Sequence, residues 1–208
     1  VDTRLFRPCT DAERAERAEW IAHGGRPEVL IAGRLDPLKG FDLAIAAVAA
    51  IEARDRPTLR IVGAPPPDGD DYARSLHEAV AAAGMLGTTS FEGALRRSLL
   101  AEQLRRASVV LVPSHSETYG LVALEAAASG VPVVARATGG LREAVSDGET
   151  GVLLETDDPA AWAAVILRIL GDPELAGGMG AAARRFALRR NWLESTRALL
   201  AVYREVLA

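Results

Sequence analysis

The feature that most constrains the fold is an alternation of short runs rich in β-branched residues with longer stretches whose apolar residues recur at helical spacing. The short runs predict strands at residues 28–33, 59–63, 89–92, 109–113, 131–135 and 151–154. The stretches between them predict helices at residues 41–53, 72–83, 98–106, 120–129, 141–145 and 159–170. Because strands separated by helices form parallel sheets, we expect an α/β, doubly wound, mostly parallel sheet of about six strands, Rossmann-like, with helices on both faces.

Residues 173–208 predict two further helical stretches without a strand between them. The second is amphipathic, and its apolar residues are Trp192, Leu193, Leu199, Leu200, Val202, Tyr203, Val206 and Leu207. We expect this apolar face to pack against another domain or a second copy of the chain, because soluble proteins rarely leave such a face in water.

Charge and composition argue against several classes of protein. The net charge of −4 and the pI of about 5.5 disfavour a general affinity for nucleic acid or anionic membranes, which need a basic field. No apolar run approaches the roughly 18 residues of a membrane-spanning helix. Cys9 is the only cysteine, so no internal disulfide can form, and we expect a reducing, cytoplasmic location.

A doubly wound sheet binds its ligands outside the carboxyl ends of its strands. The loops after Ala32, Val62, Phe91, Val112 and Val134 should therefore converge on one crevice. Two of these loops carry charged residues in patterns that indicate anion binding.

The loop after Ala32 contains Lys39, the only lysine among 24 basic residues, together with Arg34. Arginine offers a planar fork for two hydrogen bonds to an oxyanion, whereas lysine offers a compact charge on a flexible stem. The pair predicts an anion site, although a lone lysine in a solvated loop is the simpler alternative. The order Lys39-Gly40-Phe41 excludes a P-loop, which needs Gly-Lys-Ser/Thr.

The loop after Val112 places Glu117 before a predicted helix and Glu125 inside it. We expect Ser116 or Thr118 to cap this helix, so that its first N–H groups face the crevice. Such a helix end attracts phosphate. Two carboxylates that accept from sugar hydroxyls, beside cations that balance a diphosphate, fit a nucleotide sugar.

Several ordered motifs indicate a known family. They are Gly33-Arg34 with Lys39-Gly40, Pro113-Ser114 with Glu117-x7-Glu125, the segment at 127–134, Gly139-Gly140, and the segment at 147–151. In this order they resemble the C-terminal, donor-binding domain of a retaining GT-B glycosyltransferase of family four, over nearly the whole chain. The Rossmann-like domain would then be one half of a GT-B fold.

The resemblance implies a role for each matching residue. Arg34 and Lys39 would hold the diphosphate of the sugar donor and Glu117 would face the transferred sugar, which makes these three the catalytic candidates. The N–H groups at residues 120–122 would bind a phosphate, Glu125 the ribose, and the segment at 91–95 the base. The donor-binding candidates are Gly33, Arg34, Lys39, Leu95, Glu117, Gly120, Leu121, Val122, Glu125, Gly139 and Gly140. No metal or other cofactor is implied.

The resemblance also implies a division of the chain. Residues 1–22 would be a remnant of an interdomain linker with a first helix, residues 23–190 the nucleotide-sugar-binding domain, and residues 191–208 a helix that crosses to a missing N-terminal domain. The partners would be a nucleotide diphosphate sugar, more readily UDP- or GDP-linked than ADP-linked, and an unknown acceptor. The transferred group would be a hexose, and the chain would be inactive without its N-terminal half.

The sequence leaves two other functions open: a sugar-nucleotide epimerase of the same fold and a non-catalytic nucleotide-sugar-binding module. An epimerase needs more titratable groups at its sugar carbon than this histidine-poor crevice supplies. Residues 68–70 have the form of an Asp-x-Asp metal motif, but after three prolines and before a helix we expect these aspartates to form a turn and a cap. His23, His77 and His115 lack the spacing of metal ligands.

Overall fold

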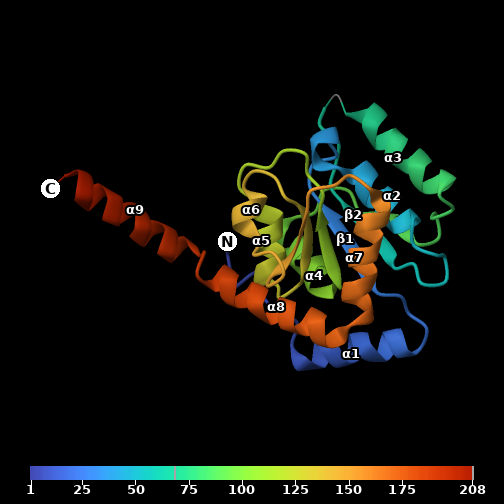
Figure 1. Cartoon of the computed structure of the whole chain (residues 1–208), viewed down its shortest axis with the longest axis horizontal. Helices are drawn as coiled ribbons and strands as arrows, with labels where there is room; N and C mark the ends of the chain where they lie inside the picture. Colours follow the sequence, from blue (N-terminus) through green and yellow to red (C-terminus); the bar gives the residue numbers. More distant parts are fainter. Residues whose placement is uncertain (68, 208) are drawn as a thin grey trace.

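The computed structural model describes residues 1–67 and 69–207, which form a six-stranded sheet with helices on both sides (Figure 1). The strands are β1 (Glu28–Ala32), β2 (Thr58–Val62), β3 (Thr89–Phe91), β4 (Val109–Val112), β5 (Val133–Arg136) and β6 (Gly151–Leu154). Their order across the sheet is β3-β2-β1-β4-β5-β6, and every neighbouring pair is parallel. The predicted doubly wound, Rossmann-like fold is confirmed.

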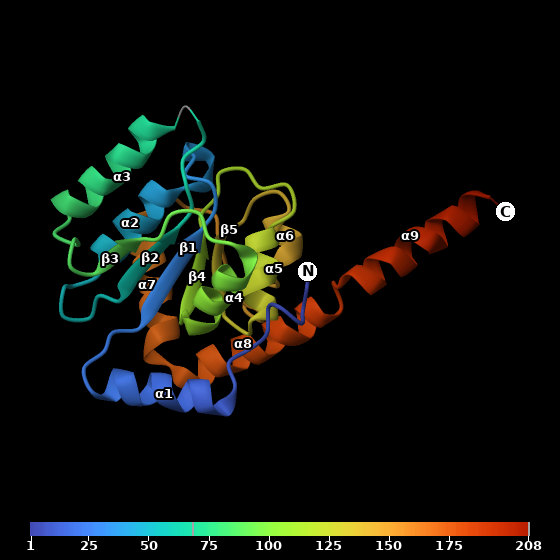
Figure 2. The same cartoon turned by 180° about the vertical axis from the view of Figure 1, so that it is seen from behind.

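Helices cover both faces of the sheet (Figures 1 and 2). They are α1 (Asp11–Ala22), α2 (Phe41–Ala49), α3 (Asp70–Ala82), α4 (Arg97–Arg106), α5 (Leu121–Ala128), α6 (Leu141–Ala144), α7 (Pro159–Gly171), α8 (Pro173–Leu188) and α9 (Trp192–Val206). Helices α2, α3 and α7 share one hydrophobic core with the sheet, and α4, α5 and α8 share the other.

The two cores arise because successive residues of a strand point to opposite sides of the sheet. On β1, Val29 and Ile31 join the core beneath α2, α3 and α7, while Leu30 joins the core beneath α4, α5 and α8. Trp162 of α7 is fully buried and donates its indole N–H to the carbonyl oxygen of Thr156 at 2.8 Å. Strands buried on both faces explain the continuous β-branched runs that marked them in the sequence.

Two of the element boundaries that differ from the prediction have a clear structural reason. Helix α2 ends at Ala49 and not at residue 53, because the chain turns there and buries Ile51 in the core. Strand β5 begins at Val133 and not at residue 131, because Pro132 has no N–H group to donate to a neighbouring strand.

The order in which the chain adds strands to the sheet reverses direction between β1 and β4. From β1 the chain moves outward through β2 to β3, then returns to β4 on the other side of β1 and proceeds to β6. The loops after β1 and β4 therefore leave in opposite directions and open a crevice at the carboxyl ends of these strands.

The start of the chain packs beside α8 and the turn that precedes α9. The amino group of Val1 donates to the carbonyl oxygen of Arg190 at 3.0 Å, and Arg184 of α8 donates to the carbonyl oxygens of Thr3 and Phe6. From this point α9 extends away from the body of the molecule, and none of its residues is buried (Figures 1 and 2). Among the helices that the structure describes, none combines the length and apolar character needed to cross a membrane.

Candidate functional site at the carboxyl ends of the strands

The crevice at the carboxyl ends of β1 and β4 holds a cavity of about 180 Å³. It is lined by the ends of both strands, the loop after each of them and the first residues of α5. Five residues that the sequence predicted for the site line this cavity: Gly33, Lys39, Glu117, Leu121 and Val122. Two loops far apart in the sequence therefore meet at the predicted edge of the sheet.

A short turn fixes Lys39 in the loop after β1. Pro37–Lys39 form a single 3₁₀ turn, whose Asp36 cap accepts a hydrogen bond from the Leu38 N–H at 2.9 Å. The carbonyl oxygen of Leu38 accepts from the N–H of His115 at 2.8 Å, which ties the turn to the loop after β4. Because the turn is held to both strands, the Lys39 side chain points across the crevice.

The central contact of the site is an ion pair between Lys39 Nζ and Glu117 Oε2, which lie 2.8 Å apart. Both side chains are mostly buried, with 27% and 16% of their surface exposed. Burial alone would raise the pKa of Glu117, but the hydrogen bond and charge of Lys39 and the backbone N–H groups of Gly120 and Tyr119 together lower it. Glu117 is therefore ionised at neutral pH, and the crevice contains a fixed pair of opposite charges.

Arg34 lies at the rim and does not line the cavity. Its guanidinium is paired with Asp36 across 3.3 Å, and 62% of its side chain is exposed. Lys39 thus faces the crevice from inside while Arg34 stays outside on the same loop. Joint anion binding by Arg34 and Lys39 stays a prediction, and Lys39 is the better placed of the two.

The N-terminus of α5 is formed by a backbone turn. The helix begins at Leu121 after Gly120, which adopts the left-handed conformation (φ 77°), and no side chain in this described segment caps it. The prediction that Ser116 or Thr118 caps the helix is therefore wrong. A Cβ at residue 120 would lie 2.8 Å from Ala144 Cβ, so packing against α6 selects glycine here. The N–H groups of the first turn are left without a side-chain acceptor beside the cavity.

The loop after β5 packs directly on the segment that carries Glu117. The N–H of Gly140 donates to the carbonyl oxygen of Glu117 at 2.8 Å. A Cβ at Gly139 would collide with the same carbonyl oxygen, and a Cβ at Gly140 would collide with that of Thr118. The two glycines therefore allow an approach between these loops that no larger residue permits.

Glu125 and Leu95 lie outside the cavity lining. Glu125 follows Leu121 by one turn of α5, is nearly fully buried, and accepts a hydrogen bond from Arg97 of α4 at 3.2 Å. Burial raises the pKa of Glu125, and the charge of Arg97 acts in the opposite direction. Leu95 precedes α4 and packs against the core beneath α4 and α5. Arg97 could not be predicted from the sequence, because its contact joins residues on two different helices.

The described residues contain no cluster suited to a metal ion. Within residues 1–67 and 69–207, no three His, Cys, Asp or Glu side chains lie together as ligands would. Asp68 of the predicted Asp-x-Asp segment lies outside the described residues. Gly69 is the N-cap of α3 and Asp70 lies in its first turn, where the helix dipole stabilises a carboxylate.

A parallel, doubly wound sheet with a lysine, a carboxylate and an uncapped helix N-terminus at its switch point is the architecture of nucleotide-binding α/β domains. Sucrose-phosphate synthase from Thermosynechococcus elongatus has this fold, with 34% identity and a TM-score of 0.86 over 100% of this chain and 51% of that one. HepE from Anabaena, solved in complex with UDP-glucose, also shares it, with 23% identity and a TM-score of 0.85 over 99% of this chain and 56% of that one. The class of the chain is thus one Rossmann-like half of a GT-B glycosyltransferase fold.

Residues 12–186 match the model of the family described as Glycosyl transferases group 1, and the chain belongs to this family. Among curated proteins, D-inositol 3-phosphate glycosyltransferase from Geodermatophilus obscurus is 44% identical over 208 residues, covering 98% of this chain and 45% of that protein. The chain spans about half the length of the curated relatives it matches. The family resemblance predicted from the sequence motifs is confirmed.

Proposed function

We propose that this chain is the donor-binding half of a retaining glycosyltransferase, which transfers a hexose from a nucleotide diphosphate sugar to an acceptor. The observation that carries the proposal is the 2.8 Å ion pair between Lys39 and Glu117 beside the uncapped first turn of α5. A cation and backbone N–H groups suit a diphosphate, and a carboxylate suits the hydroxyls of a sugar. Membership of the Glycosyl transferases group 1 family supports the same assignment.

The ion pair gives Lys39 two alternative partners during a reaction. In the structure Glu117 neutralises its charge. A diphosphate that enters the crevice competes for Lys39, which leaves Glu117 able to accept a hydrogen bond from the sugar. As the glycosidic bond breaks, negative charge grows on the departing diphosphate, and Lys39, assisted from the rim by Arg34, stabilises it. We assign catalytic roles to these three residues on this basis.

The remaining contacts with the sugar donor follow the elements that surround the cavity. The first N–H groups of α5 would bind a phosphate, because they are uncapped beside the cavity. The carboxylate one turn along α5 would bind the ribose, and the loop before α4 would border the base. The proposed residues are Gly33, Leu95, Gly120, Leu121, Val122, Glu125, Gly139 and Gly140.

We propose UDP as the nucleotide, ahead of GDP and ADP. The support is the shared fold with HepE, whose structure carries UDP-glucose. The acceptor is selected elsewhere, because the chain spans about half the length of its curated relatives. A cytoplasmic location rests only on the single cysteine and stays a prediction.

The proposal divides the chain into a linker remnant with a first helix at residues 1–22, the nucleotide-sugar-binding domain at 23–190, and a crossing helix at 191–208. The crossing helix includes α9, whose apolar side chains are exposed along its length. We expect this face to dock on an N-terminal domain or, without one, on a second copy of the chain. X-ray scattering that shows a monomer at all concentrations, with α9 mobile, would contradict both.

Calorimetry with UDP, GDP and ADP, with and without Mg²⁺, tests the proposal. UDP should bind, and Lys39→Ala should weaken its binding by about tenfold to a hundredfold, because a charge-assisted hydrogen bond is lost. Asp70→Ala is the matched control and should leave binding unchanged, since Asp70 lies at the start of α3. If none of the nucleotides binds, the donor-binding role is wrong. If UDP binds, an assay of sugar transfer by the chain joined to an N-terminal half distinguishes an enzyme from a non-catalytic binding module.

A further inference from the structure

A second and larger hollow lies at the opposite end of the sheet. This groove has a volume of about 690 Å³, within the range of small-molecule sites. Its floor is the amino-terminal ends of β1, β2 and β3, and its walls are α1 and α4. Figure 2 shows α1 passing below these strands with α4 beside them. No residue with a proposed role in nucleotide-sugar binding lines the groove.

The floor of the groove is polar and incompletely paired. Arg60 of β2 forms ion pairs with Glu28 at 2.6 Å and with Glu92 at 2.5 Å. Among the described residues, Glu28 Oε1 and Arg60 Nε are buried and have no hydrogen-bond partner. Buried polar atoms in folded proteins are nearly always paired. The side chains of Arg60 and Glu28 line the groove and stay partly exposed, by 26% and 14%, so its floor offers a guanidinium donor and a carboxylate acceptor to the hydroxyl groups of a ligand.

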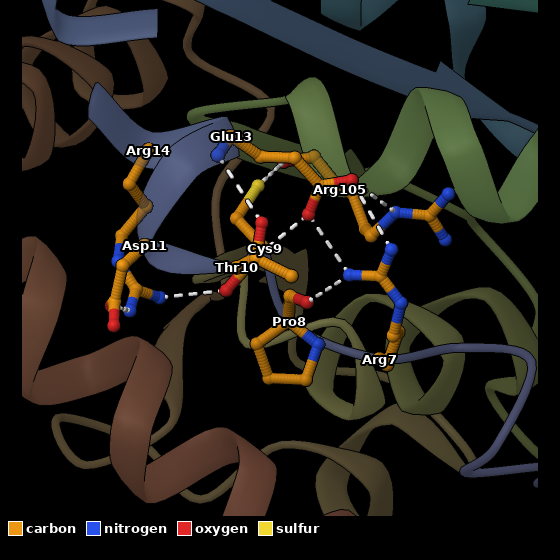
Figure 3. Close-up of polar contacts among 8 residues, drawn as sticks. All are labelled: Arg7, Pro8, Cys9, Thr10, Asp11, Glu13, Arg14 and Arg105. Carbon is orange, nitrogen blue, oxygen red and sulfur yellow. Dashed lines mark hydrogen bonds and ion pairs between the residues drawn. The ribbon is translucent and has the colours of Figure 1, made fainter. Parts of the chain in front are cut away.

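Helix α1 forms a wall and buries none of its own residues. Polar contacts hold its beginning: Arg7 forms a two-pronged pair with Glu13, and the Cys9 thiol donates to the carbonyl oxygen of Arg105 at 2.9 Å (Figure 3). Farther along, Arg17 donates to the carbonyl oxygen of Arg106 at the end of α4. The helix is thus fixed at the rim by hydrogen bonds, which leaves its apolar side chains available to the groove.

Trp20 supplies the aromatic surface of this wall. It lines the groove, and 52% of its surface is exposed. Indole rings of this kind bind flat, weakly polar surfaces such as the C–H face of a sugar ring. Trp20 and the side chains of Glu28 and Arg60 therefore offer one apolar face and two hydrogen-bonding groups to the same ligand.

The charges of the groove favour an uncharged ligand over an ionic one. Among the described residues that line it, four glutamates stand against four arginines, so their formal charges cancel: Glu13, Glu16, Glu28 and Glu102 against Arg17, Arg60, Arg105 and Arg106. Most of these arginines are already paired with carboxylates or backbone carbonyls. A phosphate would meet carboxylates, and an ammonium would meet guanidinium groups, at close range. The balance of charges therefore favours a ligand without a net charge.

We infer that this groove is a binding site for a neutral saccharide, a mono- or disaccharide whose ring stacks on Trp20 and whose hydroxyls bond to Glu28 and Arg60. The site is separate from the crevice at the other end of the sheet and does not depend on the function proposed for that crevice. It would hold a sugar without a nucleotide, at a distance from the Lys39–Glu117 pair.

Amide NMR spectra of the ¹⁵N-labelled chain test this inference. D-Glucose and maltose are added as neutral probes, with glucose 6-phosphate and glucosamine as charged comparisons and UDP present to occupy the other crevice. The neutral sugars should shift amides at residues 16–21, 58–60 and 88–90, and the charged sugars should bind more weakly. An absence of shifts in these segments, shifts only around residues 117–122, or preference for a charged sugar would overturn the inference.

Two variants and one control locate the contact. Trp20→Ala should weaken maltose binding by about fivefold, because an aromatic stacking surface is lost. Glu28→Gln should also weaken it and leaves Arg60 paired with Glu92. Trp192→Ala removes an exposed tryptophan from α9 and should change nothing. A Trp20→Ala chain that keeps its spectrum and binds maltose as tightly as the unmodified chain would refute the site.

Discussion

The two ends of the parallel sheet carry hollows that differ in both size and chemistry. The cavity at the carboxyl end measures about 180 Å³ and is built around an ion pair and an uncapped helix N-terminus. The groove at the amino end measures about 690 Å³, and its charges cancel. Volume alone would favour the groove as the nucleotide site, whereas the chemistry of the two hollows supports our proposal that the nucleotide binds in the smaller crevice.

The difference follows from the direction of the helices. In a parallel sheet each crossover helix begins near the carboxyl ends of the strands and ends near their amino ends, so N–H groups gather at one edge and carbonyl groups at the other. Helix α5 presents its first N–H groups to the crevice, whereas the last carbonyls of α4 at the groove accept from Cys9 and Arg17. This polarity supports the two proposals of an anion site at the carboxyl end and an uncharged ligand in the groove.

The largest effect is expected where two loops meet at the carboxyl end. In Gly140→Ala, the new methyl group collides with the Thr118 carbonyl, which should cost about 2 kcal/mol of folding free energy as overpacking does. The same collision displaces the segment that carries Glu117, so UDP binding should fall by more than about tenfold. Urea unfolding and calorimetry measure the two quantities.

Gly178→Ala is the matched control for this change. A Cβ at residue 178, within α8, meets no atom within 4 Å, so the variant should gain about 0.5–1 kcal/mol of stability as glycine leaves a helix. Equal stability of the two variants would show that residue 140 tolerates a methyl group, and the close approach of the two loops would then not constrain the carboxyl end of the sheet.

A smaller effect is expected at the amino end and concerns pH. The Arg7 guanidinium, followed by the backbone N–H of Thr10, lowers the pKa of Glu13 from 4.5 to about 2. A carboxyl whose pKa is lowered by folding stabilises the protein above its unfolded pKa and loses that contribution as the pH falls through the folded value. The melting temperature should therefore fall between about pH 4.5 and pH 2, and less steeply in Glu13→Gln.

Glu16→Gln, on the same helix, separates this contact from a general loss of negative charge. It should leave the acid dependence of melting unchanged relative to the unmodified chain. If both variants flatten the dependence equally, α1 is not held by the Arg7–Glu13 pair, and the wall of the groove needs another anchor.

Much of the carboxyl end could be predicted from the sequence because its determinants are local or follow from the fold class. Each strand is a short β-branched run. Because residues that follow parallel strands meet at one edge of the sheet, the sequence predicts that Lys39 and Glu117 lie close together, as they do in the structure. The cap of α5 could not be predicted. It depends on Gly120 packing against Ala144, a contact across a strand and two loops that no local pattern records.

The groove at the amino-terminal ends of the strands was not predicted from the sequence. It is assembled from α1, the starts of three strands and the end of α4, and no spacing in the sequence links Trp20 to Arg60 or to Arg105. The orphaned atoms of Glu28 and Arg60 become visible only when their neighbours are placed around them. A site at the carboxyl ends of parallel strands can therefore be predicted from the sequence, because the fold class brings those loops together. A site covered by one additional helix, as the groove is by α1, cannot.

The smallest expected effect concerns Arg34 and tests whether the anion site extends beyond the cavity. Arg34 is mostly exposed and paired with Asp36, so Arg34→Ala should weaken UDP binding by only about twofold to threefold, the usual worth of a screened surface charge. Arg54→Ala, which removes a more exposed arginine after α2, is the control and should have no effect. A loss as large as that of Lys39→Ala would mean that Arg34 leaves Asp36 and enters the crevice when the diphosphate binds. No loss at all would reduce the anion site to Lys39 and the N-terminus of α5.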